Sequence, residues 1–297
     1  MYTKKQDLFE DIKRKLNLDN LSFKFLRRQV FSEFYEVSGL DNRYILKISK
    51  TGTGIQEEFN TLKKLSSNGI NVIQPVCFSK RFNYLITVKE DGLVSLDELI
   101  HKGISKDMMR KYLFVFGQEL RKINNLTAKD SPFDFDMFIS SIKEKLGYTS
   151  NFRPEEKDRI VNFLSRKRIS INKKNLGVCL TSDFHFCNIM LRNKKDIFLL
   201  DFADAALNNE YENLSLIYLC CRYKSKINTE KLFRSFLKGY GLEKIEKEVM
   251  DIFIIKHLID YINHTSDKIN KSNLIKRLIY SSDIIKYKLF LNKIISS

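Results

Sequence analysis

The chain has 297 residues, 43% of them hydrophobic, which is enough to bury a sizeable core and argues against a disordered protein. Lys and Arg number 52 against 36 Asp and Glu, so the formal net charge is +16. We expect the charged N-terminus to form an amphipathic helix and not a signal peptide, and no apolar run approaches the length of a membrane span. We therefore expect a cytoplasmic protein, and leave open a peripheral contact with the inner face of a membrane.

The cysteines do not show the pattern of a disulfide-based or zinc-based scaffold. There are five, an odd number, and they are scattered without metal-ligand spacing. Cys220 and Cys221 are adjacent within an apolar stretch. Reduced, buried thiols are the expected state.

The first third of the chain alternates expected strands with one helix. Tyr44–Ile48 is a strand pattern with Lys47 near its middle, and such a lysine commonly faces solvent on an edge strand. Residues 57–65 predict a helix, because Phe59, Leu62 and Leu65 are spaced for one helix face. The segment 69–76 then reads as a helix end and a return strand.

A division of the chain is expected near residue 92. Tyr84–Val88 is a further strand, and a polar turn ending at Gly92 follows it. From there on the spacing is mainly helical, as at Met109, Tyr112, Leu113, Phe116, Leu120 and Ile123. We therefore predict an α+β chain with a small β-rich lobe at residues 1–92 and a larger, mainly helical lobe at 93–297. The last stretch, 252–295, is also spaced for helix.

The most informative segment lies at 180–205. Asp183 is followed by Asn188, then by an apolar hairpin of residues 189–191 and 197–200 with a polar turn, and then by Asp201 and Phe202. This layout is typical of a kinase catalytic loop and its metal-binding segment. A phosphoryl acceptor needs a carboxylate beside its hydroxyl, which Asp183 would supply. Magnesium on a nucleoside triphosphate needs hard oxygen ligands, which Asn188 and Asp201 would supply. Alternatively, Asp183 or Asn188 caps a turn.

These residues resemble the catalytic core of the aminoglycoside phosphotransferase and choline kinase superfamily, which has a protein-kinase-like fold. The superfamily reads His-Gly-Asp-x-His-x-x-Asn followed by Asp-Phe or Asp-Trp, and Asp183, His185, Asn188 and Asp201 match it. Thr181 and Ser182 replace its His-Gly. The superfamily also includes kinases of lipopolysaccharide sugars. The resemblance extends faintly from about residue 26 to 240 and is strong near 180–205.

The resemblance implies further roles in the N-terminal lobe. Lys47 would hold the α- and β-phosphates and pair with a helix glutamate, for which Glu58 fits because it lies four residues before Leu62. Glu57 is the alternative, and a solvated helix charge is the simpler interpretation of either. Ser32 lies where a hairpin should cover the nucleotide, and it is the candidate there for a contact with the phosphates. Adenine would contact backbone groups between Val88 and Glu90.

The basic surplus bears on the acceptor. Basic residues gather at Arg166–Arg168, at Lys173 and Lys174, and at Lys271, Lys276, Arg277, Lys286 and Lys288. In the simpler interpretation, the chain is rich in Lys, Ile and Asn because its codon usage is biased, and these basic residues are solvated without a further role. The functional alternative is an anionic partner, either a phosphorylated glycan or a membrane surface, whereas nucleic acid is disfavoured because no recognition module is present. A polycationic aminoglycoside would need an acidic pocket, so the charge argues mildly against one.

The sequence therefore predicts an ATP- and Mg²⁺-dependent kinase that phosphorylates a hydroxyl of a small molecule or glycan. A sugar of a bacterial surface polysaccharide or lipopolysaccharide is the favoured acceptor. A choline- or aminoglycoside-type kinase is the alternative enzyme. Because Thr181 and Ser182 depart from the superfamily, a nucleotide-binding pseudokinase that scaffolds a complex also stays open.

Overall fold

The computed structural model describes residues 2–29, 31–39, 42–51, 54–171, 177–193, 196–225, 227–270 and 272–296. The chain forms two compact units: Met1–Leu126 with Ser182–Ala206 and Glu230–Gly241, and Thr127–Thr181 with Leu207–Thr229 and Leu242–Ser297. We describe each unit by itself, and the lobe boundary near residue 92 stays a prediction. The basic residues Lys173, Lys174 and Lys271 lie outside the described residues.

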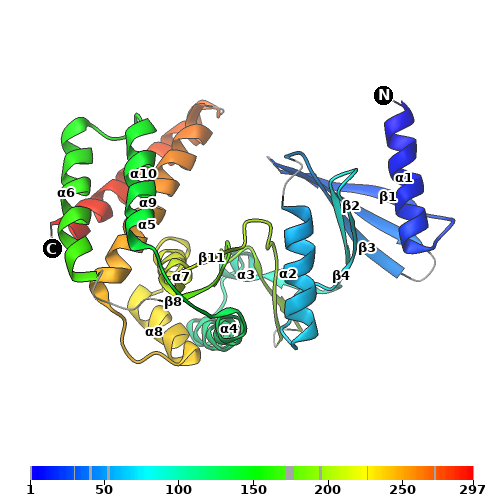
Figure 1. Ribbon diagram of the computed structural model, residues 1–297, viewed down its shortest axis with the longest axis horizontal. Helices are drawn as coiled ribbons and strands as arrows, with labels where there is room; N and C mark the ends of the chain where they lie inside the picture. The colour runs from blue at the N-terminus through cyan, green and yellow to red at the C-terminus, as the bar shows by residue number, and fades with distance from the viewer. Residues whose placement is uncertain are drawn as a thin grey trace. The chain divides into compact units, whose positions relative to one another are not determined.

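The first unit begins with a helix and an antiparallel sheet (Figure 1). Helix α1 spans Tyr2–Leu16, and the sheet has the order β1-β2-β3-β5-β4. Its strands are β1 (Ser22–Arg28), β2 (Ser32–Gly39), β3 (Asn42–Ser49), β4 (Pro75–Ser79) and β5 (Tyr84–Val88). The predicted strands at 44–48 and 84–88 are confirmed as β3 and β5.

The two faces of this sheet have different partners. Leu46 lies opposite Tyr35 and Ile86 on the neighbouring strands, and it packs with Ile12 of α1. Because side chains alternate along a strand, the next residue, Lys47, points to the other face. Helix α2 (Ile55–Ser67) lies on that face (Figure 1). The alternation therefore directs Lys47 toward α2.

Helix α2 packs through residues three and four positions apart, because these share one face of a helix. Its buried residues are Ile55, Glu58, Leu62 and Leu65. Gly54 precedes it with φ 82°, and a Cβ there would stand 3.1 Å from the Ala203 carbonyl oxygen. Gly54 thus permits both the left-handed turn and the close approach of α2 to the segment after Asp201.

The rest of the first unit holds a small sheet and three helices. The sheet has the order β10-β9-β6, with β6 at Leu93–Ser95, β9 at Ile189–Arg192 and β10 at Asp196–Leu199. The helices are α3 (Leu96–His101), α4 (Lys106–Thr127) and α8 (Thr229–Tyr240). The antiparallel β9–β10 pair confirms the predicted apolar hairpin.

Two glycines set the distance between α4 and α8. A Cβ on Gly117 would stand 2.3 Å from the carbonyl oxygen of Phe236, and one on Gly239 would stand 1.9 Å from that of Phe114. Side chains cannot occupy that space, so the two helix backbones touch only because both residues are glycine. Phe116 and Phe236 then pack beside this crossing, with ring centroids 5.5 Å apart.

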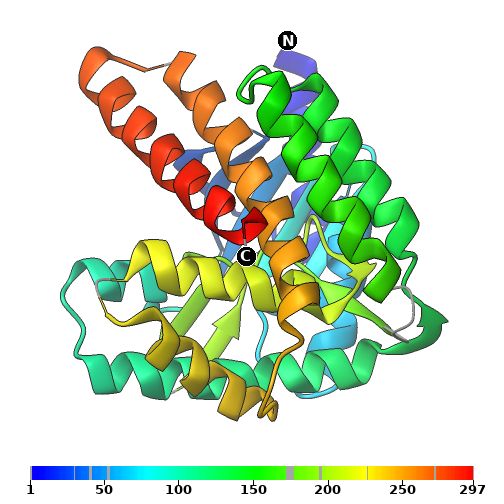
Figure 2. The ribbon, with the colours of Figure 1, turned by 90° about the vertical axis from the view of Figure 1, so that its left-hand side faces the viewer.

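The second unit is mainly helical. It contains α5 (Phe135–Tyr148), α6 (Pro154–Ile171), α7 (Glu210–Lys224), α9 (Lys247–Asn270) and α10 (Leu274–Ile295). Figure 2 shows α9 and α10 side by side. A three-stranded sheet has the order β11-β8-β7, with β7 at Lys129–Pro132, β8 at Gly177–Thr181 and β11 at Ala206–Asn208. Among the described residues, no helix combines the length and apolarity needed to cross a bilayer.

The elements confirm an α+β chain and the helical spacing expected for 252–295. The stretch 252–295 is two helices, and the Asn273 side chain begins the second by accepting a hydrogen bond from the Lys276 amide at 3.1 Å. Cys179, Cys220 and Cys221 are buried as expected, whereas Cys187 is exposed and Cys77 partly so. The expectation of buried thiols is therefore wrong for Cys187, which lies in the loop before β9.

Candidate active site

Lys47 is the centre of a buried ion-pair cluster in the first unit. Its Nζ lies 2.9 and 3.1 Å from the two carboxylate oxygens of Glu58 and 2.9 Å from Oδ1 of Asp201. The exposed fraction of the side chain is 12% for Lys47, 4% for Glu58 and 40% for Asp201. Lys47 therefore does not face solvent on an edge strand, and it joins β3 and α2 to Asp201, which is 154 residues further along the chain.

The cluster has more negative than positive charge. Burial acts to lower the pKa of Lys47, but the carboxylates of Glu58 and Asp201 outweigh it and raise the pKa. Burial raises the pKa of Glu58, and the Lys47 ammonium opposes that shift. Two carboxylates thus face one cation, and the more exposed carboxylate, Asp201, can still meet a positive ligand. Glu57 is exposed, so Glu58 is the residue that pairs with Lys47.

Asp201 has an unusual backbone conformation. Its φ is 61°, in the left-handed region that few residues other than Gly occupy, although Asp tolerates it better than most. The buried Ser182 side chain donates a hydrogen bond to the Asp201 carbonyl oxygen at 3.0 Å. Ser182, which stands where the superfamily has Gly, therefore ties the loop of Asp183 to the turn that orients Asp201.

Backbone hydrogen bonds shape the loop that carries Asp183. The Asn188 amide donates to the His185 carbonyl oxygen at 2.8 Å, and the Leu200 amide donates to the Asn188 carbonyl oxygen at 3.0 Å. The Asn188 side chain donates through Nδ2 to the Asp183 carbonyl oxygen at 2.7 Å. Asn188 thus closes a turn, which is the alternative that the sequence left open beside its predicted role as a metal ligand, while Asp183 has an exposed side chain.

Buried aromatic residues anchor the backbone next to Asp183 and next to Asp201. Phe184 and Phe202 are buried, with ring centroids 5.9 Å apart in an edge contact, and Phe184 also contacts Phe116 of α4 at 6.1 Å. Phe184 follows Asp183, and Phe202 follows Asp201. Each acidic residue is therefore next to a ring fixed in the core, which limits the movement of its backbone.

The chemistry of the donor set fits a small divalent cation. With Nδ2 of Asn188 engaged, its amide oxygen is the atom left to face an ion, and Asp201 offers a carboxylate oxygen. Both are hard oxygen donors of the kind that Mg²⁺ prefers. Among the described residues, no group of three or more His, Cys, Asp or Glu could hold a metal ion by itself. An ion here would complete its coordination with water and phosphate oxygens, as Mg²⁺ commonly does.

The predicted nucleotide contacts are less well supported by geometry. Ser32 is buried at the start of β2 and lies opposite Ser49 of β3. The Val88 amide donates to the Gln74 carbonyl oxygen at 2.9 Å, so this amide is not available to adenine. The Glu90 side chain binds Arg192 at 3.0 Å. The roles of Ser32, Val88 and Glu90 stay predictions.

Part of the basic surface is neutralised within the second unit. Arg168 makes two hydrogen bonds to Asp136, each 2.6 Å long, and Lys167 contacts Glu248 at 2.9 Å. Arg166, beside them, is exposed. The surface that 166–168 offers to an anionic acceptor is therefore smaller than the sequence alone indicates.

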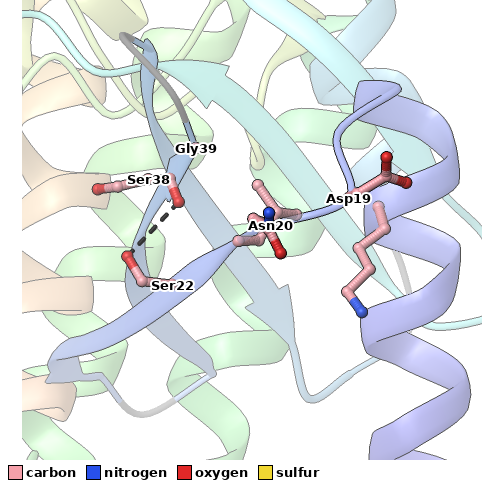
Figure 3. A pocket seen from close by; sticks show the side chains of 7 residues that line it. Asp19, Asn20, Ser22, Ser38 and Gly39 are labelled. Carbon is pink, nitrogen blue, oxygen red and sulfur yellow. Dashed lines mark hydrogen bonds between the residues drawn. The ribbon is translucent and has the colours of Figure 1, made fainter.

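A separate hollow lies beside the end of α1. It measures about 510 Å³, and its lining includes Asp19, Asn20, Ser22, Ser38 and Gly39 (Figure 3). The Ser22 hydroxyl reaches the Ser38 carbonyl oxygen there at 3.5 Å. None of the residues predicted to bind nucleotide or metal lines this hollow.

Solved structures resemble nearly the whole chain. Spectinomycin phosphotransferase APH(9)-Ia, in complex with ADP and spectinomycin, is 14% identical, with a TM-score of 0.66 over 95% of this chain and 93% of that chain. Choline kinase LicA from Streptococcus pneumoniae is 14% identical, with a TM-score of 0.67 over 95% of this chain and 98% of that chain. ADP-bound aminoglycoside phosphotransferase APH(2'')-Ib is 15% identical, with a TM-score of 0.62 over 95% and 97%.

At such low identity the likeness establishes the fold. The chain has the protein-kinase-like fold that aminoglycoside phosphotransferases and choline kinases share, as the sequence predicted. No protein-family model matches the sequence. No curated protein matches it either.

Proposed function

We propose that the protein is an ATP-dependent phosphotransferase that moves the γ-phosphate to an alcohol hydroxyl. The observation that carries this proposal is the placement of Lys47 within 2.9 Å of both Glu58 and Asp201. A lysine fixed by a helix glutamate and close to a metal-ligand carboxylate is the arrangement that protein kinases use for phosphoryl transfer. The solved structures with ADP bound support the choice of nucleotide.

Each residue has a role that follows from its position. The Lys47 ammonium would bind phosphate oxygens, and Glu58 would keep it oriented toward them. Asp183, exposed on its loop, would position the acceptor hydroxyl and accept its proton. Asn188 and Asp201 would hold Mg²⁺, which would neutralise charge on the phosphates. The presence of all five residues favours an enzyme over a pseudokinase scaffold.

For the acceptor we propose a hydroxylated glycan that carries negative charge, such as a sugar of a bacterial surface polysaccharide or lipopolysaccharide. The support is the net charge of +16, which would attract an anionic molecule. A lipid-linked acceptor of this kind would bring the protein to an anionic membrane surface. A choline- or aminoglycoside-type acceptor is the second candidate, and the structural neighbours named for choline and spectinomycin favour it.

Phosphate transfer from labelled ATP to a panel of acceptors tests the proposal. The panel should include phosphorylated glycans, their neutral counterparts, choline and an aminoglycoside, each at low and high salt. We expect transfer to the anionic glycans, with an acceptor KM that rises with salt because exposed charges are screened beyond about 8–10 Å. Preference for choline or the aminoglycoside would move the second candidate ahead.

Nucleotide binding without transfer to any member of the panel would favour the pseudokinase scaffold. Binding is measured separately, as the rise in melting temperature with Mg-ATP.

An Arg166→Glu variant adds a test of the anionic acceptor, since Arg166 is exposed. A matched control is Arg234→Glu on α8, also exposed. An acceptor KM raised equally by both changes would remove residue 166 from the acceptor surface.

A further inference from the structure

Helix α10 carries a stripe of exposed, large apolar side chains. Five of them are between 55% and 71% exposed: Ile275, Leu278, Ile279, Ile285 and Leu289. Steps of three and four residues connect Ile275, Leu278, Ser282, Ile285 and Leu289, which places them on one face of the helix. Large apolar side chains on a protein surface are normally exposed one at a time, so a row of them along one helix face indicates an interaction surface.

The opposite face of α10 already has its partners. Leu291 and Ile294 are buried, and the Phe290 ring stacks with Tyr218 of α7 at 6.4 Å. Tyr287 contacts Tyr261 of α9, with ring centroids 5.7 Å apart. One apolar face of α10 therefore packs against its neighbours in the second unit, and another apolar face is exposed. We call this exposed face, from Ile275 to Leu289, the α10 stripe.

The charges around the α10 stripe are positive. Lys286 lies four residues after Ser282 and Lys293 lies four after Leu289, so both lysines share the face of the stripe, and both are exposed. The whole helix has five cationic residues and one acidic residue, Asp283, which binds Lys286 at 3.1 Å. A second copy of the chain would bring the same lysines together without carboxylates in the stripe to offset them.

We infer that the α10 stripe docks on the surface of an anionic lipid bilayer. The apolar side chains would enter the boundary between headgroups and acyl chains, and Lys286 and Lys293 would meet the lipid phosphates. A helix that lies along the membrane with apolar side chains inward and lysines beside them has this chemistry. The stripe spans 15 residues, and the 14 steps from Ile275 to Leu289 correspond to roughly 21 Å of helix. The inference rests on the proposed function in one respect: a lipid-linked acceptor would give the protein a reason to be at the membrane.

Flotation of the full chain with lipid vesicles tests this inference without nucleotide or acceptor. We expect the protein to float with vesicles of phosphatidylglycerol and phosphatidylcholine, and not with phosphatidylcholine alone. The variant Leu278→Gln/Ile285→Gln/Leu289→Gln should lose flotation. The matched control Met137→Gln/Tyr148→Gln/Leu207→Gln changes three exposed apolar residues away from α10 and should float normally.

A charge variant tests the second component. Lys286→Glu/Lys293→Glu should lower binding to anionic vesicles by about tenfold or more, because each basic residue near the surface contributes to the attraction. The control Arg234→Glu/Lys238→Glu makes the same change in net charge on α8 and should have a smaller effect. All substituted residues are exposed, and a thermal melt of each variant checks that it is folded.

Three outcomes would overturn the inference. In the first, the wild-type chain does not float with anionic vesicles. In the second, the variant of the α10 stripe floats as well as the wild type. In the third, sedimentation shows a dimer that the stripe variant abolishes, so that a second copy covers the surface. None of these outcomes bears on phosphate transfer to a soluble acceptor, so failure here is distinguishable from failure of the proposed function.

Discussion

Each unit of the molecule contains a buried lysine held between two carboxylates. In the first unit Lys47 lies between Glu58 and Asp201. In the second, Lys256 lies between Glu212 and Asp260, at 3.1 Å from the latter. The exposed fractions of the two lysine side chains are similar, 12% and 19%, and the carboxylates raise the pKa of both lysines although burial opposes this.

The two clusters differ in their charge balance and in how open their carboxylates are to solvent. Asp260 has a second cation, Lys145, at 2.7 Å, so that two lysines balance two carboxylates in the second unit. In the first unit one lysine faces two carboxylates, and Asp201 is held in a left-handed turn with its side chain partly open. A balanced cluster has no excess negative charge to attract a ligand, whereas an unbalanced and open one can accept a cationic ligand. Charge balance therefore distinguishes a structural cluster from a candidate site.

The largest expected effect belongs to the first unit. Asp183→Asn should lower turnover by about 10²–10⁴, because the amide cannot accept the acceptor proton, while nucleotide affinity should change little. Steady-state kinetics with the best acceptor of the panel measures this. Asp196→Asn, at an exposed position of the nearby hairpin, is the control and should retain turnover. Wild-type turnover in Asp183→Asn would remove that residue from the chemistry.

The next prediction concerns the balanced cluster. Lys256→Met leaves the buried carboxylate of Glu212 without its lysine, while Asp260 keeps Lys145, and it should lower the free energy of unfolding by roughly 3 kcal/mol. The folded fraction should keep its turnover. Urea denaturation measures the loss, and Lys238→Met, an exposed lysine of α8, should change stability little. The double variant Glu212→Gln/Lys256→Met should recover part of the loss, and no recovery would contradict the ion-pair interpretation.

A pair of matched substitutions tests the difference between the two clusters directly. Asp201→Ala should abolish the rise in melting temperature that Mg-ATP produces. In the wild type, a ligand at 100 times its Kd should raise the free energy of unfolding by about 2.7 kcal/mol. Asp260→Ala should lower the melting temperature but keep the rise. Thermal melts with and without Mg-ATP measure both. An undiminished rise in Asp201→Ala would show that this carboxylate is not the metal ligand.

Ser182 should have a smaller effect on the same site. Ser182→Ala removes the hydrogen bond to the Asp201 carbonyl oxygen, a loss of about 1 kcal/mol. If that bond orients Asp201, the Mg²⁺ concentration for half-maximal turnover should rise several-fold, with a smaller change in the melting temperature. The control Ser49→Ala changes another buried serine, which contacts Thr51. An unchanged Mg²⁺ requirement in Ser182→Ala would contradict the positioning role.

The smallest expected effect is a pH dependence in the second unit. Burial lowers the pKa of His257 below its ordinary value of 6.5, with Lys256 acting in the same direction and Glu212 and Asp260 opposing. The unfolded chain therefore takes up a proton more readily than the folded one. The stabilisation is present above pH 6.5 and is lost as the pH falls toward the lower pKa of the folded state.

Urea midpoints measured from pH 7.5 to pH 5 test this sign. His257→Gln should flatten the dependence, whereas His101→Gln, at an exposed position on α3, should leave it unchanged. A dependence that is equally steep in His257→Gln would assign it to other groups.

The sequence could predict features that depend on local spacing. The hairpin of β9 and β10, strand β5 and the set of Asp183, Asn188 and Asp201 all follow from residues close together along the chain. The choice of Glu58 over Glu57 came from the resemblance, whose pattern places the glutamate four residues before a leucine, here Leu62. The break between α9 and α10 had a local signal too, the capping residue Asn273.

Features that depend on distant pairs were beyond the sequence. The bond between Ser182 and Asp201 spans 19 residues and needs the left-handed turn, which no local pattern indicates. The cluster around Lys256 joins α5, α7 and α9 through Lys145 and Glu212. The partners of Lys167 and Arg168 likewise come from other elements, so sequence counting overestimated the open basic surface.

The crossing of α4 and α8 has a consequence for how the chain can vary. At Gly117 and Gly239 an added Cβ would meet backbone atoms of the other helix rather than side chains. A side chain can shrink in a compensating second substitution, but a carbonyl group cannot. Neither glycine can therefore be rescued by a change at its contact residues, Phe236 and Phe114. Among homologous chains that keep this crossing, both positions should be invariant and should show no covariation.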